Sequence, residues 1–83
     1  MEIFIKVAPQ AYERLRRQIP VESSTREAFN KASRIEHALE GVQFEGYSIP
    51  CDEDQARVIL EIAKQCCPDI VRDIETAIML SRR

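Results

Sequence analysis

The chain has 83 residues, a formal net charge of −2 and 45% hydrophobic residues. This length fits one domain whose core is near the lower limit for independent stability, so self-association is an open alternative to a monomer. The weakly acidic balance excludes a general electrostatic attraction to nucleic acid or anionic lipid. No apolar run approaches the roughly 18 residues of a membrane span.

The beginning of the chain and its cysteines bear on location. Glu2 stands beside the start, and no basic-then-apolar pattern of a secretion signal follows it. Three cysteines are an odd number without the spacing of a disulfide framework, which favours reduced thiols. We therefore expect a single cytoplasmic domain spanning residues 1–83.

Residues 1–7 alternate between two sides, which predicts a β-strand with β-branched residues facing inward. The inward positions are Met1, Ile3, Ile5 and Val7, and the outward positions are Glu2, Phe4 and Lys6. Pro9 is placed to begin a short helix, and Pro20 to end it. The apolar face of that helix consists of Ala11, Tyr12, Leu15 and Ile19.

A second helix is predicted from Thr25 to Glu40. The segment Ser24–Glu27 matches the capping box, in which a serine and a glutamate three residues apart satisfy helix N–H groups. Helical spacing also places five apolar residues on one face: Ala28, Phe29, Ala32, Ile35 and Leu39. Gly41 is then expected to be the left-handed residue that follows the last turn.

Residues 42–49 admit two interpretations. As one strand, neither face is cleanly apolar. As a hairpin turning at Glu45 and Gly46, the segment would place four apolar side chains on one face. These would be paired as Val42 with Ile49 and Phe44 with Tyr47. The hairpin explains the residues better, although glutamate is unusual before the glycine of a tight turn.

The last part of the chain, from Cys51 to Leu80, predicts two amphipathic helices. Asp52 and Gln55 form an aspartate variant of the capping box. Pro68 disfavours helical geometry at Cys67 and is well tolerated at the start of a helix, so the break should fall there. A joint this short predicts a helical hairpin.

The expected order is β-α-α-β-β-α-α. This is an α+β fold with a small, mainly antiparallel sheet of two or three strands covered by four helices. The first strand should lie beside the predicted hairpin, because an isolated two-stranded ribbon is marginally stable. A sheet this small leaves strand edges open, and pairing of these edges between two copies would bury them.

The cysteines suggest no clear metal or haem site. Adjacent Cys66 and Cys67 would point about 100° apart on a helix, so a zinc site would need one of them together with Cys51 and His37. Cys67–Pro68 resembles the dipeptide of haem-regulatory motifs, but Pro68 already has a structural role. The simpler interpretation is that Cys66 and Cys67 are small apolar core residues. We expect no cofactor and no metal.

No nucleophile–base pair can be assembled from the sequence. A paired-carboxylate mechanism stays open, although helix capping already accounts for Asp52, Glu53 and Asp54. A thiol enzyme needs a base beside its nucleophile, and His37 is the only histidine. On the predicted helix, His37 lies opposite the apolar face and would be solvated. The chain also lacks a Gly-rich phosphate loop and the common hydrolase and metalloprotease motifs.

Arg14, Arg16 and Arg17 form the densest positive cluster, and Arg26, Arg34 and His37 would form a sparser strip on the next helix. Side by side, these could bind phosphate groups. Interleaved glutamates and the acidic total instead favour a solvated surface.

Three apolar residues remain outside the predicted core, namely Met79 and Leu80 in the last helix and Phe4 in the first strand. If they adjoin, they form a patch of the kind that binds partners. The leading hypothesis is therefore a non-catalytic protein–protein interaction module, with a homodimer as one form. The alternative is a nucleic-acid-binding or regulatory domain using Arg14, Arg16 and Arg17, and the third is a cysteine- or metal-dependent activity.

Overall fold

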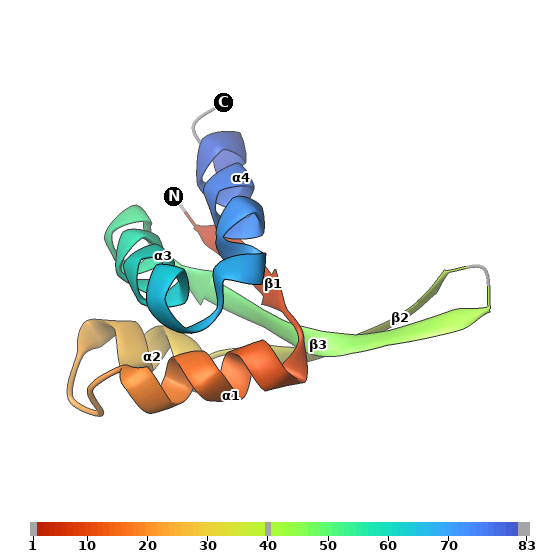
Figure 1. The fold of residues 1–83 in the computed structure, drawn as a ribbon, viewed down its shortest axis with the longest axis horizontal. Helices are drawn as coiled ribbons and strands as arrows, with labels where there is room; N and C mark the ends of the chain where they lie inside the picture. The colour runs from red at the N-terminus through yellow and green to blue at the C-terminus, as the bar shows by residue number, and fades with distance from the viewer. Residues whose placement is uncertain (1, 40, 82–83) are drawn as a thin grey trace.

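The protein is an α+β domain in the predicted order (Figure 1). It is seen in a computed structural model that describes residues 2–39 and 41–81, without the side chains of residues 37–39 and 42–44. Three strands form one antiparallel sheet, which packs with four helices. In chain order the elements are β1 (Ile3–Val7), α1 (Pro9–Gln18), α2 (Ser24–Asn30), β2 (Ser33–Leu39), β3 (Val42–Cys51), α3 (Glu53–Cys66), the 3₁₀ turn η1 (Pro68–Ile70) and α4 (Val71–Ser81).

Strand β3 is the central strand, in the order β1-β3-β2. Its C-terminal half pairs with β1, from Ile3 opposite Cys51 to Val7 opposite Tyr47. Its N-terminal part pairs with β2, from Ser33 opposite Ser48 to Leu39 opposite Val42. The two partners therefore overlap only briefly along β3. Beyond the overlap, β2 and β3 continue as a two-stranded ribbon that extends away from the helices (Figure 1).

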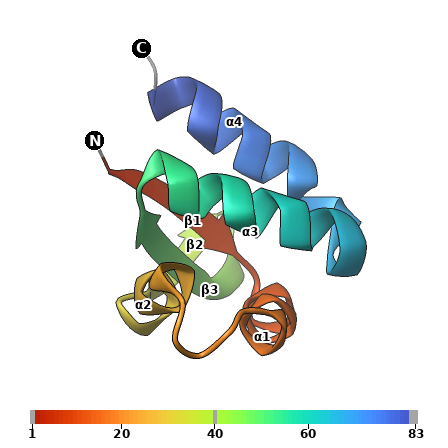
Figure 2. The ribbon, with the colours of Figure 1, turned by 90° about the vertical axis from the view of Figure 1, so that its left-hand side faces the viewer.

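The core lies on one face of the sheet. Ile3, Ile5 and Val7 of β1 are buried, as predicted, and the outward Phe4 and Lys6 are exposed. Met1 falls outside the described residues. The core consists of side chains from β1, β3, all four helices and the turns beside them: Ile3, Ile5, Val7, Leu15, Ile19, Ala28, Phe29, Ile49, Cys51, Ala56, Ile59, Ala63, Cys67, Ile74 and Ile78. Figure 2 shows α3 and α4 side by side above, and α1 and α2 below.

The predicted helix from Thr25 to Glu40 is wrong beyond its second turn. Helix α2 ends at Asn30, and residues 33–39 form β2. The N-cap is Ser23, whose side chain accepts a hydrogen bond from the backbone N–H of Arg26. Ile35 and Leu39 are four residues apart, so they lie on one side of either a helix or a strand. Their spacing alone therefore does not decide between the two structures. Antiparallel pairing with β3 selects the strand, since tertiary contacts override local preference.

The predicted hairpin at Glu45 and Gly46 is also wrong, since Val42–Cys51 is one continuous strand. The strands reverse direction between Leu39 and Val42 instead. Gly41 lies there with a φ of 81°, so its left-handed conformation serves this reversal and not a helix end. Gly46 is needed for a close approach, because a Cβ atom there would overlap the carbonyl oxygen of Val7.

The C-terminal helices agree with the prediction. Asp52 and Gln55 form both hydrogen bonds of the capping box at the start of α3. Helix α3 ends at Cys66, and Cys67 has a non-helical φ of −142°. Pro68 then begins the 3₁₀ turn that leads into α4. The chain direction changes at this break, which sets α4 beside α3 and against β1.

Candidate partner interface

Within residues 2–39 and 41–81, the outer edge of β1 faces no other strand, because β1 is the first strand in the order β1-β3-β2. On this strand Phe4 keeps 54% of its surface exposed, although it is a large hydrophobic residue. Glu2 and Lys6, the alternate neighbours of Phe4, are also exposed. The strand thus buries one side against the helices and presents the other, mixed side outward.

A groove runs between this edge and α4. Its volume is about 600 Å³, and β1 and α4 supply its walls. The lining residues are Glu2, Ile3, Phe4, Lys6, Asp73, Thr76, Ala77, Leu80 and Ser81. The structure therefore brings two of the three residues selected from the sequence, Phe4 and Leu80, to one surface feature.

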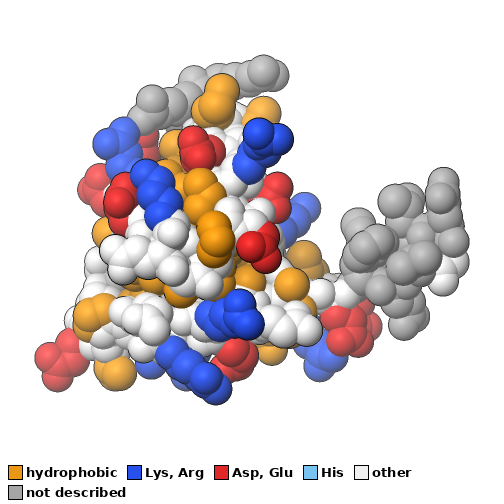
Figure 3. All heavy atoms as spheres, viewed as in Figure 1, with side chains coloured by type: hydrophobic (Ala, Val, Ile, Leu, Met, Phe, Trp, Pro, Cys, Tyr) orange, Lys and Arg blue, Asp and Glu red, His pale blue; other side chains and the backbone are white. Residues whose placement is uncertain are grey.

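The packing of α4 explains why Leu80 reaches the groove. Ile74 and Ile78 are buried one turn apart, and this fixes which side of α4 contacts the core. Leu80 lies off that side and is 56% exposed. Met79 is 70% exposed but is not part of the groove wall. On the face seen in Figure 3, hydrophobic side chains lie along α4 with charged side chains on both sides.

Sequence reasoning missed the other groove residues, above all Ala77, Asp73, Glu2 and Lys6. For Lys6 of β1 and for Glu2, which directly precedes β1, a signal was present. Glu2 and Lys6 alternate with Phe4, so they had to share its side of the strand. For Asp73 and Ala77 no local signal exists, because only the packing of α4 against β1 places them there.

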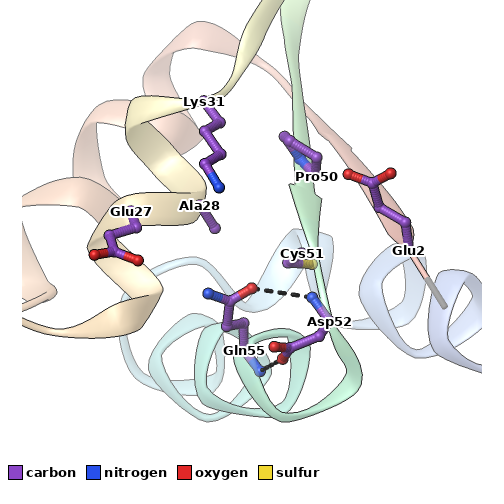
Figure 4. Close-up of a pocket in the computed structure, with 8 residues that line it drawn as sticks. All are labelled: Glu2, Glu27, Ala28, Lys31, Pro50, Cys51, Asp52 and Gln55. Atoms are coloured by element: carbon purple, nitrogen blue, oxygen red, sulfur yellow. Dashed lines mark hydrogen bonds between the residues drawn. The ribbon is translucent and has the colours of Figure 1, made fainter.

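A second hollow lies between α2, the end of β3 and the start of α3 (Figure 4). Its volume is about 270 Å³. Asp52 and Gln55 line it, and both are engaged in the capping box. The Gln55 side-chain amide also donates to the carbonyl of Ser24 at 2.7 Å. This polar cluster joins α3 to α2 and serves the fold.

A third hollow, of about 510 Å³, marks the place where the β2–β3 ribbon leaves β1. It is lined by Lys6, Val7, Ala8, Ile35, Glu36, Glu45 and Gly46. Two of its lining residues, Glu36 and Glu45, form ion pairs with Arg34, at 3.7 and 3.5 Å. These pairs are well exposed, and such contacts contribute little to stability.

The arginines considered from the sequence as one basic face lie on three elements, α1, α2 and β2. Arg14, Arg16 and Arg17 are exposed on α1. Arg26 lies on α2, where its guanidinium donates to the carbonyls of Arg16 and Ile19 at the end of α1.

Arg34 and His37 were expected on the same helix as Arg26. That expectation is wrong, since both residues belong to β2. The side chain of His37, and with it the predicted solvated state, lies outside the described residues.

The three thiols are separated into two places. Cys51 is buried at the end of β3, and its Sγ lies 3.5 Å from the carbonyl oxygen of Ile3. Burial, assisted by the nearby carboxylates of Asp52 and Glu2, raises the pKa of Cys51 to about 11. Cys67 is also buried, which together with its contact to Cys66 raises its pKa. The Sγ atoms of Cys66 and Cys67 are 3.5 Å apart.

Cys51 and Cys67 are poorly suited to nucleophilic chemistry, because the reactive form is the thiolate and a raised pKa disfavours it. Among the side chains that the structure describes, no group of three His, Cys, Asp or Glu residues could hold a metal ion. Cys67 of the Cys67–Pro68 dipeptide is a core residue.

Comparison with known proteins finds no family model, no curated protein and no solved structure that matches this chain. Within the described ranges, no helix combines the length and apolar character needed to cross a membrane. The groove between β1 and α4 therefore has to be interpreted from its own geometry.

Proposed function

We propose that this protein is a non-catalytic protein–protein interaction module, and that the groove between β1 and α4 receives an extended segment of the partner. The observation that supports the proposal is the meeting of Phe4 and Leu80 in one groove along an open strand edge. A segment lying there can hydrogen-bond to the strand edge and cover both side chains. This is the β-strand addition used by many peptide-binding domains.

The energetics favour such an occupant. Phe4 and Leu80 are each more than half exposed, at 54% and 56%. Full burial of a side chain of this size from water contributes about 1.5–3 kcal/mol, so burying the exposed halves contributes about 2 kcal/mol in total. The open edge also presents backbone N–H and C=O groups that a partner strand can satisfy. Both contributions act on the same partner segment.

The alternative functions have less support. Catalysis by the cysteines is disfavoured by the burial and raised pKa values of Cys51 and Cys67. Nucleic-acid binding through Arg14, Arg16 and Arg17 would rest on one short helix in an acidic chain. Such a surface lacks the extended basic footprint of most nucleic-acid-binding domains.

Site-specific photo-cross-linking tests the proposal. A photoreactive amino acid placed at Leu80 should form covalent adducts with protein in a lysate of the native cell, and a photoreactive amino acid at Val21 should not. Val21 is a matched control because it is also an exposed hydrophobic residue, at 74%, in the link between α1 and α2. Adding Phe4→Asp to the Leu80 probe should reduce the adducts, since a carboxylate would disfavour an apolar partner.

Equal cross-linking from both positions would contradict the proposal, because contacts at Leu80 would then be no more specific than chance encounters. Adducts that persist unchanged with Phe4→Asp would contradict the shared role of Phe4 and Leu80. The molecular mass of each adduct also shows whether the partner is a second copy of this chain or another protein.

A further inference from the structure

The charge pattern of residues 2–6, which comprise most of β1 and the residue before it, is complementary to itself. Glu2 and Lys6 stand two residues before and two residues after Phe4, with opposite charges. We propose that the groove between β1 and α4 receives β1 of a second copy, antiparallel, with Phe4 opposite Phe4 across a two-fold axis. This inference rests on the proposed function and names the partner segment and its register.

The backbone of β1 is oriented for this pairing. In an antiparallel sheet, residue pairs that exchange both hydrogen bonds alternate with pairs that exchange none. Pro50 has no N–H and lies opposite Phe4, so the bonded pairs with β3 are the alternate ones, such as Ile5 opposite Ile49. The N–H and C=O groups of Phe4 and Lys6 are then directed away from β3, toward the groove.

The register follows from the charges. With Phe4 opposite Phe4, Glu2 of each copy lies opposite Lys6 of the other. Two opposite-charge pairs and one aromatic pair then form on one face, and cross-strand pairs of these kinds are favourable. The same alignment sets Phe4 of one copy opposite Phe4 of the other, with the backbone groups of both directed toward each other. The N–H of each Phe4 then donates a hydrogen bond to the C=O of the other.

The neighbouring registers lose this match. An axis at Lys6 would set two lysines opposite each other, and an axis at Glu2 would do the same with two glutamates. Like charges directly opposite are destabilising. An axis at Ile3 or Ile5 gives neither Glu2 nor Lys6 an opposite charge as its direct partner. The Phe4-centred alignment is thus the one in which both charges are matched.

Self-pairing also accounts for the exposed end of α4. Helix α4 lies beside β1 at this edge of the sheet. In the two-fold symmetric dimer, the α4 helices of both copies therefore lie next to the new pair of β1 strands. Leu80 would be covered there, and Met79, the next residue, would lie at the margin. The product is one continuous sheet of six strands, β2-β3-β1-β1-β3-β2, in which the open β1 edges disappear.

A charge-reversal experiment tests the register. Glu2→Lys and Lys6→Glu each create two like-charge pairs in a homodimer, so sedimentation equilibrium should show each variant associating at least about tenfold more weakly than the natural chain. An equimolar mixture of the two variants should recover association, because both pairs are opposite in charge in the mixed dimer. Glu61→Lys mixed with Lys64→Glu is the matched control, with the same changes in charge on the outer side of α3, and should leave association unchanged.

A cross-link tests the axis. Two Cα atoms in a bonded antiparallel pair are about 5.5 Å apart, which suits a disulfide. In a Cys66→Ser background, Phe4→Cys should form a covalent dimer when oxidised glutathione is the oxidant, with release of two molecules of glutathione. Lys6→Cys should not, since the two introduced thiols would be separated by four residues of strand, roughly 13 Å.

The outcomes separate the two proposals. A chain that stays monomeric at high concentration while the Leu80 photo-probe captures a different protein would overturn self-pairing and leave the proposed function standing. A monomeric chain with no specific adducts would overturn both. A dimer whose charge-reversed variants do not recover on mixing, or that cross-links through Lys6→Cys, would overturn the Phe4-centred register.

Discussion

The two halves of β3 show what stabilises this small fold. The half from Tyr47 to Cys51 pairs with β1 and is covered by helices, so Ile49 and Cys51 are buried. The preceding half pairs with β2 alone and extends away from the helices, where Glu45 is exposed. One continuous strand therefore passes from a packed core into a ribbon that lies beyond the helices. We expect the half paired with β1 to depend on side-chain burial and the half paired with β2 to depend mainly on backbone pairing.

The largest expected difference between the halves comes from removing one apolar side chain in each. Ile49→Ala should lower the free energy of unfolding by about 3 kcal/mol, because Ile49 is fully buried and its loss leaves a cavity. Ile35→Ala, in the ribbon, should cost about 1 kcal/mol or less, because Ile35 is only partly buried. Urea denaturation followed by circular dichroism at one fixed protein concentration measures both. Equal losses would contradict the comparison.

The junction of the halves should be nearly as sensitive. Gly46→Ala places a Cβ atom against the carbonyl oxygen of Val7, so the ribbon has to shift away from β1. We expect a loss of about 1–3 kcal/mol in the free energy of unfolding, as for other overpacked sites. Gly41→Ala is the control: it meets nothing within 4 Å but has to adopt a φ of 81°. Its expected cost is about 1 kcal/mol, from backbone strain alone. A harmless Gly46→Ala would contradict the close approach.

The packed half should also respond to alkaline pH. Burial, with Asp52 and Glu2 nearby, raises the pKa of Cys51 from 9.0 to about 11. Between these values the unfolded chain releases the thiol proton while the folded chain keeps it, so the free energy of unfolding falls as pH rises. Cys51→Ala should remove this part of the pH dependence, whereas Cys66→Ser should keep it. Urea denaturation at several pH values from 8 to 11 makes the comparison. If the free energy of unfolding fell equally steeply with pH in the natural chain and in Cys51→Ala, burial of the Cys51 thiol would be contradicted.

The same division governs what the sequence could predict about the fold. Segments whose own residues carry the signal were predicted correctly. The alternation of β1 and the apolar faces of α1 and α3 predicted these elements, and proline geometry predicted the break at Pro68. The β2–β3 ribbon was not. Ile35 and Leu39 satisfy two periodicities, and the choice is made by pairing with residues of β3 that local patterns do not report.

The candidate interface was predicted in part for a related reason. Phe4 and Leu80 could be selected because each departs from the pattern of its own element. Their meeting in one groove depends on the position of α4 against β1, which is a property of tertiary packing. Gly46 gives the converse case, since a glycine needed for close backbone approach was interpreted as a turn residue.

The smallest expected effect concerns the ion pairs of the ribbon. Arg34 lies within 4 Å of both Glu36 and Glu45, and all three side chains are more than half exposed. If backbone pairing stabilises the ribbon, Arg34→Ala should change the free energy of unfolding by about 0.5 kcal/mol or less, because solvent screens such pairs. Hydrogen exchange of the ribbon amides, measured by NMR, should likewise change little. Arg57→Ala, which removes a pair with Glu53 on α3 at 3.2 Å, is the matched control and should be equally mild. A loss above about 2 kcal/mol, or ribbon amides that lose all protection in Arg34→Ala, would mean that this charge cluster, and not the backbone ladder, stabilises the half of β3 that extends beyond the helices.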